Sequence, residues 1–109
     1  MTRDIKLYLR DITDAIKNIE TYTRNMDIDA FIKDRRTMDA VVRNLSVIGE
    51  AVRQIPKEVK KHHPDIPWNS IAGMRNKIIH EYFGIDEEIL WKTIKENIPD
   101  LKKKIKKIG

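Results

Sequence analysis

The chain has 109 residues and a formal net charge of +5, with 40% hydrophobic and 36% charged residues. This length suits one domain with one core, and the composition is too apolar for a disordered chain and too charged for a membrane protein. The absence of Cys excludes disulfides, thiolate nucleophiles and Cys-ligated zinc. The first residues, MTRDIKLYLRDITD, place acids where a signal peptide needs an apolar core, so we expect a cytoplasmic protein without membrane contact.

The positive charge is concentrated at the C-terminal end. Residues 101–109 contain five Lys and no acid, while the remaining 17 basic side chains are balanced by 17 acidic ones. Lysines in the last turn of a helix complement the helix dipole and are usually a solvated face. Clustered lysines also attract a phosphate backbone without reading its sequence. Both interpretations stay open for this tail.

Helical periodicity dominates the start of the chain. Apolar residues three and four apart predict a helix over residues 4–24, with Asp4 or Thr2 as its N-cap. Asp27 is placed to cap a short helix that contains residues 30–32.

A second long helix is predicted from Asp34 to Ile55. It contains Gly49, which costs about 1 kcal/mol in a helix interior and therefore indicates close approach of another helix. Its apolar face is wide enough to contact two neighbours, such as the bundle core and a second subunit. This face consists of Met38, Val41, Leu45, Ile48, Val52 and Ile55, widened by Val42, Val47 and Ala51.

Prolines and acidic caps divide the second half of the chain. Pro56 ends the long helix and suits the first turn of a short one, and the prolines of residues 62–67 indicate a loop. Further helices are predicted from Trp68 to before Gly84, from the cap Asp86 to Ile98, and from Pro99 to Ile108.

The fold class predicted from this pattern is all-α. Strand signals are almost absent, and the chain shows no internal repeat, linker or second domain. Four to five helices with short connectors favour an antiparallel up-down bundle. We therefore expect a single helical domain over residues 1–109, with the Lys-rich segment 101–109 at its end.

One stretch, GMRNKIIHEYFG at residues 73–84, does not look like routine helix surface. In an ideal helix Arg75 and Tyr82 lie about 20° apart, and Asn76 stacks below His80, where its amide would orient the imidazole ring. Arg75 and His80 are about 140° apart in the same helix. They converge if the Arg side chain folds round, if the helix loosens towards its end, or if a two-fold-related copy brings a second set alongside.

Arginine and histidine together suit the cleavage of RNA through its own 2′-hydroxyl. The guanidinium of Arg75 offers a permanent charge and a fork of donors that match a phosphate. The imidazole of His80 can exchange a proton near neutral pH. An Arg and a His ending an ordinary helix would give the same spacing by chance, so the spacing alone is weak evidence.

Other polar and aromatic residues favour structural roles. Trp68 and Trp91 could stack on bases, but their positions on apolar stripes favour the core. Glu50 lies on a largely apolar helix, where burial with Arg43 or Arg53 near a dimer interface would be structural rather than catalytic.

No metal and no cofactor are expected. His62, His63 and Asp65 together with His80 could suggest a metal site. However, adjacent His side chains on a loop rarely converge on one ion, and neither has a His or a carboxylate four residues later.

Arg75-x4-His80-x-Tyr82 resembles the R-x4-H-x-Y motif of HEPN-domain ribonuclease toxins of the HepT kind. The resemblance covers residues 4–108 and does not rest on the motif alone. Further blocks follow that family's pattern in the same order: residues 43–51 (RNLSVIGEA), 64–68 (PDIPW) and 73–76 (GMRN), then Trp91 and Pro99-x-Leu101.

The resemblance implies an all-helical HEPN bundle that dimerises and cleaves RNA, tRNA among the candidates, without metal. It implies Arg75 and His80 as the catalytic pair and Asn76 as a supporting residue. It also implies a partner, a minimal nucleotidyltransferase antitoxin that transfers AMP from ATP to Tyr82 and blocks the nuclease.

Two other functions remain open at this point. A non-catalytic helical subunit of a nucleotidyltransferase complex would use Arg75 to hold a nucleotide phosphate and would cut no RNA. A helical assembly protein without chemistry would tolerate replacement of Arg75, His80 and Tyr82.

Overall fold

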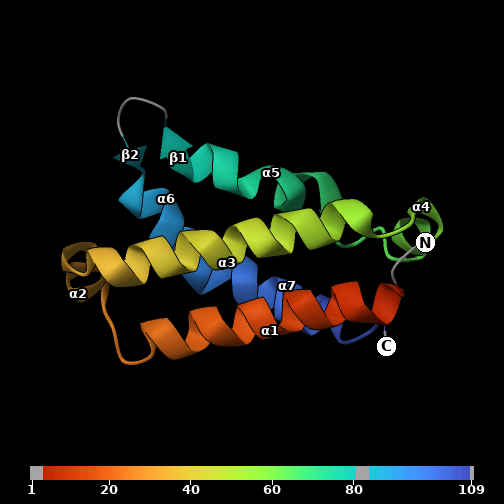
Figure 1. Ribbon diagram of the computed structural model, residues 1–109, viewed down its shortest axis with the longest axis horizontal. Coiled ribbons are helices and arrows are strands. Elements are labelled where there is room, and N and C mark those ends of the chain that lie inside the picture. Colours follow the sequence, from red (N-terminus) through yellow and green to blue (C-terminus); the bar gives the residue numbers. More distant parts are fainter. Residues whose placement is uncertain (1–3, 81–83, 109) are drawn as a thin grey trace.

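The computed structural model describes residues 4–80 and 84–108 (Figure 1). The elements are α1 (Ile5–Thr23), α2 (Ile28–Lys33), α3 (Arg35–Gln54), α4 (Lys57–His62), α5 (Trp68–Ile78), β1 (Ile79–His80), β2 (Gly84–Ile85), α6 (Glu87–Lys92), the π-helical turn η1 (Thr93–Asn97) and α7 (Ile98–Ile105). The long helical segments α1, α3, α5 and the run from α6 to α7 alternate in direction, so that the two ends of the chain lie at the same end of the molecule. The predicted all-α antiparallel bundle is confirmed.

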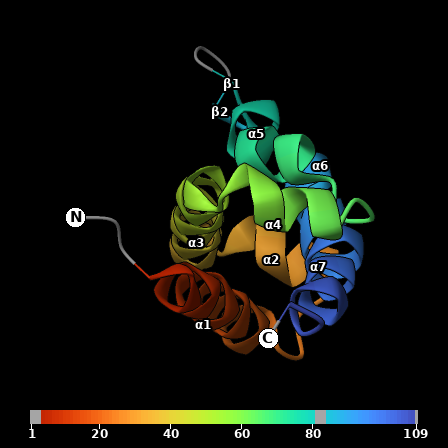
Figure 2. The same ribbon diagram turned by 90° about the vertical axis from the view of Figure 1, so that its right-hand side faces the viewer.

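The long segments surround one core. Helix α3 packs against both α1 and α5, and α7 closes the bundle against α1. Figure 2 looks along the bundle, where α4 crosses the nearer end and α2 lies towards the opposite end. The side chains with the least exposure come from every long segment and include Ile12, Ile16, Ile19, Phe31, Val41, Leu45, Ile48, Val52, Ile78, Leu90 and Ile98.

Acidic N-caps start four of the helices. The carboxylates of Asp4, Asp27, Asp34 and Asp86 accept hydrogen bonds from backbone N–H groups two or three residues later, at 2.8–3.1 Å. Such caps satisfy donors that have no partner inside the helix. The helix starts predicted at these residues are confirmed.

Gly49 allows α3 and α5 to approach closely. A Cβ at position 49 would lie 3.1 Å from the carbonyl oxygen of Ala72 and 3.7 Å from that of Ile71. A side chain would therefore meet backbone rather than a flexible group. This confirms the close helix approach that an interior glycine indicated.

The helix that begins at Trp68 ends earlier than the sequence predicted. Helix α5 stops at Ile78, and Ile79 takes an extended conformation with φ −95° and ψ 120°. The chain then forms a short antiparallel hairpin, which pairs Ile79 with Ile85 and His80 with Gly84. These ladder contacts give the backbone partners beyond the helix end, and two residues per strand are too few to leave an alternating pattern in the sequence.

The last two predicted helices form one continuous segment. Elements α6, η1 and α7 follow one another without a break, and Pro99 lies in the first turn of α7. Proline has no N–H and clashes with the carbonyl four residues earlier. The wider π turn before it, in which the Ile98 N–H bonds to the Thr93 carbonyl, lets the helix pass the proline.

None of the helices within residues 4–80 and 84–108 is long and apolar enough to cross a bilayer.

Candidate functional site

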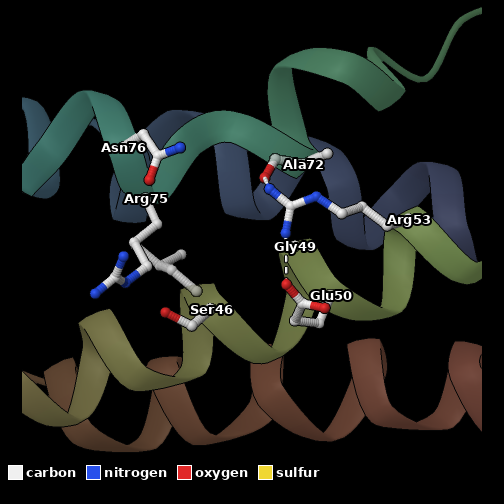
Figure 3. Close-up of a pocket in the computed structure, with 8 residues that line it drawn as sticks. Ser46, Gly49, Glu50, Arg53, Ala72, Arg75 and Asn76 are labelled. Atoms are coloured by element: carbon white, nitrogen blue, oxygen red, sulfur yellow. Dashed lines mark hydrogen bonds and ion pairs between the residues drawn. The ribbon is translucent and has the colours of Figure 1, made fainter.

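A solvent-open crevice runs between α3 and α5, beside the contact of Gly49 with Ala72 (Figure 3). Its volume is about 300 Å³. We call it the α3–α5 crevice, and its lining consists of Leu45, Ser46, Gly49, Glu50 and Arg53 from α3 and Ala72, Arg75 and Asn76 from α5.

Two of the residues singled out in the sequence line this crevice. Arg75 and Asn76 lie in the last turn of α5, and both are exposed. In Figure 3 the Arg75 side chain extends from α5 towards α3 on the side of Ser46. The Ser46 hydroxyl donates to the Val42 carbonyl at 3.1 Å, which leaves its oxygen as an acceptor at the crevice wall.

The Arg53 guanidinium joins the two walls of the crevice. Its Nη1 forms an ion pair with Glu50, one turn earlier on α3, and its Nη2 donates to the Ala72 carbonyl of α5 at 2.9 Å. The Glu50–Arg53 pair is therefore one of the two pairings considered from the sequence. In the single chain 70% of the Glu50 side chain is exposed, and its burial near a dimer interface stays a prediction.

The crevice as a whole favours anions. Its lining contains the guanidinium groups of Arg53 and Arg75 and one carboxylate, that of Glu50. Sequence reasoning found Arg75 but treated Arg53 only as a partner for Glu50. The i, i+3 spacing of Glu50 and Arg53 indicated the ion pair, whereas the bond to Ala72 depends on how α3 packs against α5.

His80 follows α5 rather than continuing it. Its backbone lies in β1, opposite Gly84, while its side chain and the whole of Tyr82 fall outside the described part of the structure. Because α5 ends at Ile78, His80 does not continue the helix, and the predicted helical stacking of Asn76 below His80 is wrong. The predicted relation of Arg75 to Tyr82 stays a prediction. The helix ends before His80, which is the loosened helix end that the sequence left open as one alternative.

Two of the residues considered for a metal, His62 and His63, make local contacts. His62 Nδ1 lies 2.7 Å from the Glu58 carbonyl oxygen, and the His63 carbonyl accepts a hydrogen bond from Trp68 Nε1 at 3.0 Å. Among the side chains that the structure describes, no three His, Asp or Glu residues are grouped as metal ligands.

Both tryptophans have the core roles expected of them. Trp68 is buried, and Trp91 is half-buried against Phe31, with ring centroids 5.0 Å apart. The Lys95 ammonium lies 4.7 Å from the centre of the Trp91 ring.

Part of the Lys-rich end is held by acidic groups of the bundle. Lys102 forms an ion pair with Glu20 of α1 at 2.9 Å, and Lys104 forms one with Asp100 at 2.9 Å. These contacts favour the solvated helix end over a free polycationic tail.

Comparison with known proteins identifies the family. The model of the HepT-like family, described as "Ribonuclease HepT-like", matches residues 12–108. A Thermococcus cleftensis protein named "Probable ribonuclease HepT" is 50% identical over 99% of this chain and 98% of its own length. A Methanocaldococcus jannaschii protein named as a putative RNase is 47% identical over 97% of this chain and 88% of its own.

A relative from Caldanaerobacter subterraneus subsp. tengcongensis, also named as a putative RNase, is 43% identical over 93% of this chain and 90% of its own. No solved structure gives a significant match. The family match over most of the chain and these full-length relatives agree with the R-x4-H-x-Y motif at residues 75–82. The chain therefore belongs to the HepT-like ribonucleases of the HEPN class.

Proposed function

We propose that the chain is the toxin of a toxin–antitoxin pair and that it cleaves RNA without a metal ion. Arg75 binds the phosphate at which the strand is cut, and His80 transfers protons. One observation carries this proposal. Arg75, five residues before His80 in the sequence, is exposed at the wall of an open crevice that a second guanidinium, that of Arg53, also lines. A ribonuclease requires an RNA substrate, and the crevice offers its phosphates a net positive lining.

The proposed reaction is a transfer of the phosphoryl group within the RNA. A base removes the proton of the 2′-hydroxyl, whose oxygen then attacks the adjacent phosphorus. The bond from phosphorus to the 5′ oxygen breaks, and an acid protonates that oxygen. The products end in a 2′,3′-cyclic phosphate and a 5′-hydroxyl. Arg75 stabilises the charge that develops on the phosphoryl oxygens, and two His80 side chains would supply base and acid.

The outer face of α3 supports a dimer that would provide the second histidine. Val47 is 38% exposed on this face, with Arg43 and Glu50 exposed on either side of it. In a two-fold antiparallel pairing of α3 centred near Val47, Arg43 of each copy lies opposite Glu50 of the other. Such a surface is self-complementary in charge, as a two-fold interface requires.

This dimer is tested by Val47→Lys. The substitution places two ammonium groups at the centre of the proposed interface, so we expect sedimentation to show a monomer and RNA cleavage to fall. Leu7→Lys is the matched control, because Leu7 is 39% exposed on α1. A Val47→Lys protein that sediments like the unmodified chain contradicts this interface.

We propose that a nucleotidyltransferase antitoxin inhibits the enzyme by modifying Tyr82. The phenolic oxygen attacks the α-phosphorus of ATP, pyrophosphate leaves, and the phenolic proton passes to a base. The adenylyl group adds bulk and negative charge close in sequence to Arg75, where it would compete with the RNA phosphate.

The proposal is tested with purified protein and total RNA in the presence of EDTA. We expect the unmodified chain to cleave and His80→Ala to be inactive, while His62→Ala, on exposed α4, keeps full activity. Cleavage that survives His80→Ala, or that needs a divalent ion, contradicts the mechanism. Stable association with a nucleotidyltransferase and no cleavage by any variant would instead favour the nucleotide-binding subunit, which the same two guanidinium groups would also suit.

A further inference from the structure

Arg53 is fixed in position before any ligand arrives. One side of its guanidinium contacts the Glu50 carboxylate, and another donates to the Ala72 carbonyl across the helix interface at 2.9 Å. Figure 3 shows this group between α3 and α5, on the side of the crevice opposite the Arg75 guanidinium. A long flexible side chain held at two points loses less entropy when it binds a ligand.

The guanidinium keeps donors for a ligand. It carries five N–H groups, of which the two described contacts occupy two. The Arg53 side chain is 48% exposed, so the remaining donors can reach the open side of the crevice. Phosphate oxygens match this planar fork of donors.

Stabilisation of the fold is a weak explanation for this arrangement. An ion pair between side chains exposed to this degree contributes about 0–1 kcal/mol. The close packing of α3 on α5 is already provided by Gly49, at the contact with Ala72. What the two contacts do provide is a defined place for a second positive charge in the crevice that Arg75 lines.

We propose that Arg53 binds the RNA phosphate next to the one at which the strand is cut. Glu50 and the Ala72 carbonyl are its positioning groups. This inference rests on the proposed function, because it assumes that the RNA strand enters the α3–α5 crevice with one phosphate at Arg75. A single strand then places neighbouring phosphates on the two guanidinium groups, which sets its register without reading its bases.

The test measures RNA binding separately from cleavage. In the His80→Ala background, the dissociation constant of a fluorescein-labelled oligouridylate is measured by anisotropy over a series of KCl concentrations. The slope of log affinity against log salt is negative, and loss of one phosphate contact reduces its magnitude by about 0.7 for a single strand. We expect this change for Arg53→Gln, together with affinity about ten-fold weaker at low salt.

Arg35→Gln is the matched control. Arg35 is also on α3, is 69% exposed and also pairs with a carboxylate on its own helix, that of Asp39. It does not line the α3–α5 crevice. We expect its slope to equal that of the background protein, and an equal slope for Arg53→Gln would overturn the inference.

The thermal midpoint of Arg53→Gln separates phosphate binding from bracing of the helices. A bracing role predicts that Arg53→Gln lowers the thermal midpoint and leaves the salt slope alone. That result would contradict the inference.

A measurement without substitution of Arg53 covers the case in which Arg53→Gln does not fold. In the His80→Ala protein, the Nε–Hε NMR signal of Arg53 should shift on titration with the oligouridylate, while that of Arg35 stays in place. A stationary Arg53 signal overturns the inference.

The failure of this inference differs from the failure of the proposed function. If the chain cleaves RNA in EDTA, requires His80 and shows an unchanged salt slope for Arg53→Gln, the proposed nuclease is supported and the phosphate-binding role of Arg53 is contradicted. If Arg53→Gln reduces the salt slope but the unmodified chain cleaves no RNA, RNA binding by Arg53 is supported and the proposed nuclease is contradicted.

Discussion

Gly49 of α3 lies so close to Ala72 of α5 that a Cβ at position 49 would approach the Ala72 carbonyl oxygen to 3.1 Å. This contact sets the spacing of the two helices that form the walls of the crevice. The same carbonyl accepts the hydrogen bond from Arg53 Nη2. One backbone oxygen therefore links the packing of the helices to the position of a charged side chain.

We expect Gly49→Ala to destabilise the protein. The substitution gains about 1 kcal/mol in helix propensity, but the added methyl group meets a backbone carbonyl in a packed helix, which cannot move as a side chain can. The thermal midpoint should fall, and the Arg53 contact to Ala72 should loosen.

Gly73→Ala is the matched control, because Gly73 lies inside α5 and a Cβ there would meet nothing within 4 Å apart from its chain neighbours and the backbone of its own helix. This variant should be more stable by about 0.5–1 kcal/mol. Urea unfolding of both variants measures the difference. A Gly49→Ala protein as stable as Gly73→Ala would contradict the tight contact.

Replacement of Arg75 should strongly reduce activity without unfolding the chain. Arg75 is exposed in the last turn of α5, so Arg75→Ala removes no core packing. Loss of one group that stabilises transition-state charge lowers a rate by about 10²–10³-fold. Arg75→Lys should recover only part of this, because the ammonium lacks the planar fork.

Initial cleavage rates and circular dichroism measure both effects. Lys77→Ala, an exposed cation in the same turn, is the control and should keep its rate. An Arg75→Ala protein with an unchanged rate and an intact fold would show that the site lies elsewhere.

The Phe31–Trp91 contact makes short helix α2 important for stability. Phe31 is fully buried and lies 5.0 Å from the Trp91 ring centroid. Phe31→Ala should cost about 3–5 kcal/mol, which is a large share of the stability of a domain this size. Urea unfolding followed by Trp fluorescence measures the loss. A cost below about 1 kcal/mol would mean that α2 does not close the bundle.

The stability that the Asp34 cap contributes at the start of α3 depends on pH. Hydrogen bonds from the Thr37 backbone N–H and from its hydroxyl hold the pKa of Asp34 below its ordinary value of 3.8. A carboxylate whose pKa is lowered by folding stabilises the fold at pH values above its pKa in the unfolded chain. This contribution disappears as the pH falls through its pKa in the folded chain.

Asp34→Ala should therefore lower the thermal midpoint at neutral pH. The difference in thermal midpoint between this variant and the unmodified chain should shrink below about pH 3.8. Thr37→Val removes only the hydroxyl donor and should give a smaller change of the same sign. A difference that stays constant through this acid range would contradict the role of the carboxylate.

The sequence was sufficient for the bundle and its helix starts. Asp27 and Asp86 predicted helix starts because N-capping depends only on nearby residues. Gly49 predicted a close helix contact because a glycine inside a helix lowers stability. The hairpin after Ile78 was missed, since its strands are too short to show a period. The bond from Arg53 to Ala72 was missed because it depends on the crossing of two helices that are distant in sequence.

Analysis of the RNA ends tests the central claim most directly. RNA is incubated with the purified chain in EDTA, and the chemistry of the new ends is determined by mass spectrometry. Attack by the 2′-hydroxyl predicts 2′,3′-cyclic phosphates and 5′-hydroxyls that disappear with Arg75→Ala and with His80→Ala. New 5′-phosphate ends, or cleavage only after a divalent ion is added, would contradict the account.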